Sequence, residues 1–135
     1  MPDRGADGDG GAAVVDFVLL AVLLLLLLFA VLQAAVYFYA RTVVAAAAAD
    51  AARYAAAYGV DPQAGADRAR RLIGQGLDDH DAAAMSCTSR LGRDAASGLP
   101  VAVVHCVGRV RLLFSPLGLP LRVDVTSSVL REGRP

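Results

Sequence analysis

The sequence contains no lysine, so its thirteen basic residues are all arginine, and they balance thirteen acidic residues. A formal net charge of zero argues against a nucleic-acid partner, because neutralising phosphates requires a basic patch. The chain also lacks a glycine-rich phosphate loop, a G-x-S-x-G motif and a credible set of nucleophile, base and orienting residue. The sequence therefore predicts a protein that is not an enzyme and that binds no cofactor.

Apolar side chains dominate the region near the start of the chain. From Phe17 to Ala40 the run is interrupted by one polar side chain, Gln33. As a helix, this stretch would be about 36 Å long, against a hydrocarbon core of about 30 Å. It is thus expected to span a membrane over about residues 17–40. A small membrane enzyme would need a polar cluster inside this span, and Gln33 alone does not make one.

The residues before this run are rich in glycine and aspartate and show no periodicity, which is typical of a disordered leader. A cleaved signal peptide usually has an apolar region of about 7–15 residues behind a basic front. Here the apolar run is longer, and the front carries three aspartates against a single arginine, Arg4. A conventional signal peptide is therefore disfavoured.

One acidic residue, Asp16, stands at the beginning of the apolar helix. A carboxylate at the centre of a spanning helix costs about 2.5–3.5 kcal/mol on insertion scales. Asp16 lies one turn from the front end of the helix, where the cost is smaller but real. The sequence therefore predicts that Asp16 has a positively charged partner.

The helix is predicted to continue through an alanine-rich stretch as far as Tyr58, since no breaker precedes Gly59 and alanine has the highest helix propensity. Asp50 and Arg53 are spaced to pair along this helix. The alanines at 45, 49, 52 and 56 form a smooth stripe. The stripe predicts either close packing against a partner helix or the chain's own later domain, or else a plain helical stalk.

Residues 59–135 are expected to form a small α+β domain. Asp61 and Pro62 would open a short second helix, whose apolar stripe comprises Ala66, Ala69, Ile73 and Leu77. After Ala84 the apolar period changes to two, in runs beginning at Met85, Pro100 and Pro120. These runs predict an antiparallel sheet of three to four strands, with a bulge at Gly108.

The two cysteines, Cys87 and Cys106, fall in successive predicted strands. A disulfide between them closes a loop of about 20 residues and stabilises the domain by about 3 kcal/mol in the chain-entropy model. Free buried thiols are the alternative, and His80 with His105 would complete a zinc ligand set by residue type. Adjacent strand residues point to opposite faces, and close-spaced ligand pairs are missing, so no metal is predicted. The acidic run Asp78–Asp81 reads as a solvated helix end.

The order of leader, glycine, four small or aliphatic residues, acid, phenylalanine and long apolar helix resembles the processing site of type IV pilins and pseudopilins. More closely, "GAAVVDFVLLAVLLLLLLFAVLQAAVYFYARTVVAAAAADAARYAAAYG" resembles the TadE-like family of tight-adherence pilus assembly proteins. The resemblance implies cleavage of the leader, residues 1–11, between Gly11 and Ala12. Asp16 would then be the fifth residue of the mature chain, followed by Phe17.

The resemblance also implies a set of partners and a location. A prepilin-type peptidase would remove the leader, an inner-membrane assembly platform would receive the subunit, and other pilin subunits would contact the N-terminal helix, with Asp16 meeting the free amine of a neighbour. The protein would be a single-pass cell-membrane protein, in contact with lipid, with residues 12–58 as its helix and the C-terminal domain outside the cytoplasm. The alternative is a membrane-anchored module that binds a partner without polymerising.

Overall fold

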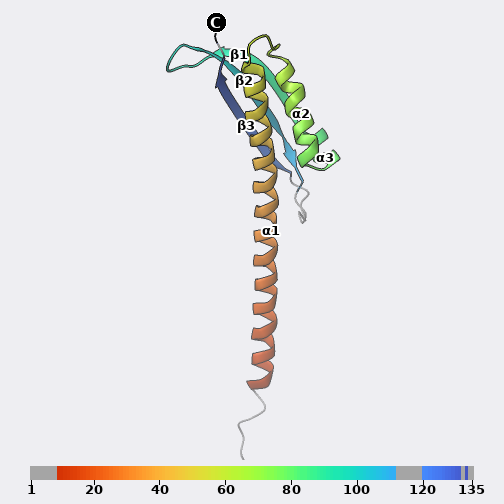
Figure 1. Cartoon of the computed structure of the whole chain (residues 1–135). Coiled ribbons are helices and arrows are strands. Elements are labelled where there is room, and N and C mark those ends of the chain that lie inside the picture. The colour runs from red at the N-terminus through yellow and green to blue at the C-terminus, as the bar shows by residue number, and fades with distance from the viewer. Residues whose placement is uncertain (1–8, 112–119, 132, 134–135) are drawn as a thin grey trace, which may run out of the picture. The chain divides into compact units, whose positions relative to one another are not determined.

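The computed structural model describes residues 9–111, 120–131 and 133 (Figure 1). Within them the helices α1 (Asp9–Ala56), α2 (Ala64–Gly76) and α3 (Asp79–Ala83) precede the strands β1 (Ser86–Arg93), β2 (Pro100–Val110) and β3 (Leu121–Leu130). The chain divides into two compact units, one ending at Ala35 and the other running from Val36 to Pro135. The predicted α+β class, with a long apolar N-terminal helix, is confirmed. Most of the predicted leader lies outside the described residues.

Helix α1 is continuous from Asp9 to Ala56. Its sequence contains no proline, and no glycine after Gly11, so every later residue can add its backbone hydrogen bond without a helix-breaking side chain. The helix is followed by Gly59, whose φ of +78° is a left-handed conformation that favours glycine. The predicted helix, residues 12–58, therefore agrees with the structure to within three residues at each end.

The alanine-rich part of α1 belongs to the core of the second unit. One face of it is almost completely buried, comprising Ala40, Val44, Ala47, Ala48, Ala51, Ala52, Ala55 and Ala56. This face packs with α2 and with the inner face of the sheet. Figure 1 shows α2 beside this part of α1, with the strands behind both. The chain's own domain thus covers the alanines, and the plain stalk is excluded.

The predicted stripe at 45, 49, 52 and 56 is right at two positions, since Ala52 and Ala56 are buried while Ala45 and Ala49 are only partly buried. The predicted pairing of Asp50 is also replaced, since this carboxylate accepts a hydrogen bond from the Arg68 guanidinium of α2 at 2.5 Å. The Arg68 guanidinium also lies over the Tyr54 ring, 5.0 Å from its centroid. These contacts hold α2 against α1.

Helix α2 begins at Ala64, two residues later than a cap at Asp61 would place it. The Asp61 carboxylate accepts a hydrogen bond from the Gln63 backbone at 3.0 Å, and the Asp61 carbonyl accepts one from Ala64. Asp61 therefore forms the turn before the helix, and the predicted cap is wrong. The predicted stripe is right at three positions, since Ala66, Ala69 and Ile73 are buried while Leu77 is partly buried.

The sheet is antiparallel in the order β1-β2-β3, so β2 is its central strand. On β2 the residues facing the helices alternate along the strand and are fully buried, as at Ala102, Val104, Cys106 and Val110. The register between β2 and β3 runs without interruption from Val101↔Leu130 to Val110↔Leu121. The predicted bulge at Gly108 is therefore wrong.

Candidate functional site

The predicted processing and assembly residues lie in the first turns of α1. Gly11, Ala12, Asp16 and Phe17 are all exposed, and Phe17 is 71% exposed. Apart from its chain neighbours and the backbone of its own helix turn, no heavy atom lies within 4 Å of a Cβ built on Gly11. Packing among the described residues thus gives no reason for glycine at this position.

Ala12 and Asp16 are four residues apart on α1. In a helix this spacing places two residues on one side, separated by roughly 6 Å along the axis. The Asp16 carboxylate is therefore on the side of the helix that carries the Ala12 backbone nitrogen. An ammonium group placed there by a neighbouring chain would reach this carboxylate from outside the helix.

Beyond Asp16, α1 presents an apolar surface. Every large hydrophobic side chain from Val14 to Leu32 is exposed. Exposed apolar patches of this size mark contact with a membrane or with another protein. By length and composition α1 is the one helix among the described residues that could cross a membrane.

These features define a class of protein, in which one N-terminal apolar helix is compatible with single-pass membrane anchoring and also contributes to a small α+β domain. Residues 11–53 match the family model described as TadE-like protein, which confirms the resemblance to that family. No curated protein and no solved structure matches the chain. The matched segment begins at Gly11, includes Asp16 and Phe17, and ends within the buried part of α1.

The matched segment covers most of α1 and less than half of the chain. The α+β domain after Arg53 lies outside the matched segment. The family match therefore gives no information about this domain.

A disulfide joins β1 to β2. Cys87 and Cys106 are direct partners in the antiparallel register, with Cα atoms 4.1 Å apart and sulfur atoms 2.03 Å apart. Cys106 is fully buried and Cys87 is 8% exposed. Both cysteines are on the inner face of the sheet, so the bridge is part of the packed core under the helices.

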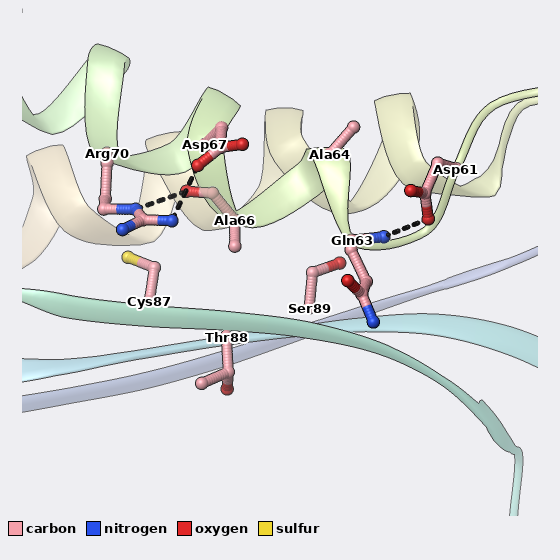
Figure 2. A pocket seen from close by; sticks show the side chains of 9 residues that line it. All are labelled: Asp61, Gln63, Ala64, Ala66, Asp67, Arg70, Cys87, Thr88 and Ser89. Atoms are coloured by element: carbon pink, nitrogen blue, oxygen red, sulfur yellow. Dashed lines mark hydrogen bonds and ion pairs between the residues drawn. The ribbon is translucent and has the colours of Figure 1, made fainter.

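A polar hollow of about 470 Å³ separates α2 from β1 (Figure 2). Cys87 and Ser89 point from β1 toward α2, while Thr88 points to the opposite side of the strand. Above them, the Arg70 guanidinium donates a hydrogen bond to Asp67 at 2.6 Å. The residues lining this hollow include no histidine, and the Cys87 sulfur is held in the disulfide.

The acidic run has a structural role in the second unit. Asp78 is the N-cap of α3 and accepts a hydrogen bond from the Asp81 backbone at 2.7 Å. Asp81 is mostly buried and faces Arg111, whose Nε lies 3.7 Å from its carboxylate. Two members of the run are thus occupied by capping and by an ion pair. The reading of the whole run as a solvated helix end holds only in part.

The alternative zinc site does not assemble. Cys87 and Cys106 are bonded to each other, and His105, the neighbour of Cys106, lies on the opposite face of the sheet. Among the described residues no group of three histidine, cysteine, aspartate or glutamate side chains comes close enough to hold a metal ion.

The outer face of the sheet carries a charged cluster that sequence spacing did not reveal. His105 Nε2 lies 2.8 Å from Asp124 Oδ1, and the Arg122 guanidinium donates to Asp124 Oδ2 at 2.9 Å. The hydrogen bond from His105, and then that from Arg122, hold the pKa of Asp124 below its ordinary value. Arg109 lies directly opposite Arg122 across the strands. Only the register brings these residues together, because thirteen positions separate Arg109 from Arg122 in the sequence.

Proposed function

We propose that the chain is a minor pilin or pseudopilin of a tight-adherence pilus, and that a prepilin-type peptidase removes its leader between Gly11 and Ala12. The observation that carries this proposal is the match to the TadE-like family, which begins at Gly11 and holds Asp16 at the position that becomes fifth after the cut. The exposure of Gly11, with no packing demand for glycine, supports recognition of this residue by an outside enzyme.

Cleavage would create a free amino group on Ala12. In a low-dielectric setting, the Asp16 carboxylate beside the ammonium group of a neighbouring subunit is far more stable than either charge alone. Such a pair also fixes the axial register of one helix against the next. The exposed apolar side chains from Val14 to Leu32 would supply the remaining contact surface, first with lipid and then with other pilin subunits.

In this proposal the protein begins as a single-pass protein of the cell membrane, with the α+β domain outside the cytoplasm. The inner-membrane assembly platform would then transfer the mature subunit into the pilus. The disulfide is consistent with an oxidising compartment for the domain.

The first test is mass spectrometry of the N-terminal peptide of the protein recovered from its native membrane. A chain beginning at Ala12 is expected, and Gly11→Leu is expected to keep its leader because a bulky side chain replaces the glycine hydrogen. Gly10→Ala serves as the control and should still be cleaved. A wild-type chain that retains residues 1–11 would leave the protein a membrane-anchored module and overturn the processing step.

The second test separates the charge of Asp16 from its shape. Asp16→Asn should insert into the membrane but fail to co-assemble with other pilins, because the amide cannot pair with an ammonium group as a carboxylate does. Asp16→Glu keeps the carboxylate and should co-assemble. Recovery of Asp16→Asn in pili at the wild-type level would refute the proposed pairing.

A further inference from the structure

The two cysteines of the disulfide differ in their places in the sheet. Cys106 is on the central strand β2, between Cys87 of β1 and Val125 of β3, and it is fully buried. Cys87 is on β1, and no described strand pairs with the other side of β1. Cys87 therefore has a neighbouring strand on one side only, and it is 8% exposed.

A hollow reaches Cys87 from outside the core. The described residues that line the hollow of about 470 Å³ between α2 and β1 include Cys87 but not Cys106. Cys87 points from β1 toward α2, and the Arg70 side chain of α2 lies across the hollow from it (Figure 2). A water molecule takes up about 30 Å³ in the liquid, so a hollow of this size admits a group as large as a cysteine side chain.

The reaction of a disulfide with a thiol depends on which sulfur the thiol can reach. Exchange begins when a thiolate attacks one sulfur and forms a mixed disulfide, while the other sulfur leaves. The reacting atoms must be aligned, so the attacking sulfur approaches along the S–S bond from the side opposite the leaving sulfur. At Cys87 this line runs away from β2, toward the free edge of β1. At Cys106 it runs toward Val125 of β3, within the core cluster.

We propose that Cys87 is a thiol–disulfide exchange site, at which a thiolate carried by a small peptide or by a protein makes and breaks the bond in the folded domain. In the breaking direction, the partner sulfur bonds to Cys87 Sγ. The electron pair of the Cys87–Cys106 bond leaves on Cys106 Sγ, which takes up a proton. A second partner thiolate then attacks the first partner sulfur, which forms the partner's disulfide and releases Cys87 as a thiolate. The partner loses two electrons, and the cysteine pair gains them.

The reverse sequence forms the bond after the domain has folded. The Cys87 thiolate attacks a partner disulfide, and one partner thiolate leaves. Cys106, held directly opposite Cys87 by the register, then attacks Cys87 Sγ and releases the other partner thiolate. Only Cys87 has to meet the partner, so the core need not open. The inference concerns the second unit alone and is independent of leader cleavage and of pilus assembly.

The first test traps the mixed disulfide on the full chain in detergent, with its disulfide intact. The protein is incubated with reduced glutathione, free thiols are blocked with N-ethylmaleimide in denaturant, and the chain is digested with trypsin. Cleavage after arginine places Cys87 in the peptide 72–90 and Cys106 in the peptide 94–109. Glutathione should be at least about tenfold more abundant on the first peptide, because a buried core segment opens in few molecules. Equal or greater labelling of the second peptide would overturn the proposal, as would labelling no faster than the domain unfolds.

The second test compares two variants that have lost the same bond. Cys106→Ser keeps the thiol beside the hollow, and Cys87→Ser keeps the buried thiol. In the folded state, Cys106→Ser should react with DTNB, an aromatic disulfide, about 100-fold faster than Cys87→Ser, whose thiol is exposed only when the core opens. Both should react at the same rate in guanidinium chloride. Equal rates for the two folded variants, at similar melting temperatures, would overturn the proposal.

A protein thiol distinguishes the two sources of the thiolate. A thioredoxin that lacks its second reactive cysteine should form a covalent complex with the wild-type chain through the peptide 72–90 if a protein is the partner. An adduct with glutathione alone would support exchange at Cys87 and assign it to a small thiol. A complex through the peptide 94–109 would overturn the proposal.

Discussion

Replacing Gly108 by alanine is expected to destabilise the domain, although the Gly108 backbone is ordinary extended strand. A Cβ built at this position collides with the Met85 sulfur and lies 2.6 Å from the Ala84 carbonyl oxygen and 2.9 Å from the Met85 Cα. The methionine side chain can rotate away, but the two backbone atoms can move only if the segment between α3 and β1 shifts. The glycine is therefore required by close approach of two chain segments.

The cost of Gly108→Ala can be estimated from these contacts. Overpacking of a filled core costs about 1–3 kcal/mol, and backbone contacts place this site in the upper part of that range. Replacing a strand glycine by alanine returns about 0.5–1 kcal/mol. The net loss of roughly 1–2 kcal/mol should lower the melting temperature of a domain this size by roughly 10 °C. Differential scanning calorimetry of the full chain in detergent micelles measures this shift.

Gly74→Ala is the matched control. Gly74 lies inside α2, and nothing is within 4 Å of a Cβ built there. The substitution should raise the melting temperature, because alanine is favoured over glycine in a helix by about 1 kcal/mol. Equal stabilisation by both substitutions would show that Gly108 is not crowded and would refute the packing argument.

Three further changes test the domain. Cys87→Ser should lower the unfolding free energy by about 3 kcal/mol under oxidising conditions and leave it equal to that of the reduced wild type in reductant, so an equal loss in both conditions would count against the bridge. Since the pKa of Asp124 is lowered in the folded chain, its contribution to stability is present above the ordinary carboxyl pKa and is lost as the pH falls through the lowered value. The melting temperature of Asp124→Asn should therefore fall less steeply at acidic pH than that of the wild type. The same acidic fall in melting temperature for both proteins would contradict this. A fragment beginning at Val36 should give a dispersed amide spectrum, whereas one beginning at Gly59 should not, because it lacks the buried face of α1.

Much of the fold could be predicted from the sequence because its period is clear in most segments. The apolar run and the alanines can only form a helix, and the alternation in 121–130 predicts a strand whose buried residue, Val123, faces the helices. The short helix α3 was not predicted. Its five residues are too few for a periodic signal, and its cap at Asp78 lies inside an acidic run that hides it in the sequence.

The buried face of α1 could not be predicted for a physical reason. From Ala45 to Ala57 ten of the thirteen residues are alanine, so only Asp50, Arg53 and Tyr54 could mark the solvent side and the hydrophobic period is weak. Tertiary packing decides the face, and Asp50 is positioned by Arg68 of another helix. A local spacing rule had assigned Asp50 to Arg53, which is its near neighbour in the sequence.

The residues of the candidate functional site also fall into those that local sequence identifies and those that only the folded chain brings together. Gly11 and Asp16 are singled out by the resemblance of one short segment to a pilin processing site, and their roles stay predictions. The facing pair Arg109 and Arg122 depends on which residues of β2 and β3 are opposite each other. Register shifts of one residue would place every side chain on the other face, so the pair becomes visible only when the pairing is known.

Helix α1 carries large exposed side chains in its first part and small buried side chains in its last part, and the two parts have different roles. Up to Leu32 the helix carries large exposed side chains, which suit contact with lipid or with a neighbouring helix. From Ala40 to Ala56 its buried face consists of alanines and a single valine, which let α2 and the sheet approach the backbone closely. The crowding at Gly65, where a Cβ would lie 3.0 Å from the Ala55 Cβ, shows how little space remains. A larger side chain at Ala51 would therefore disrupt the domain, whereas a smaller one at Leu24 would leave the domain core unchanged and reduce only the exposed apolar surface.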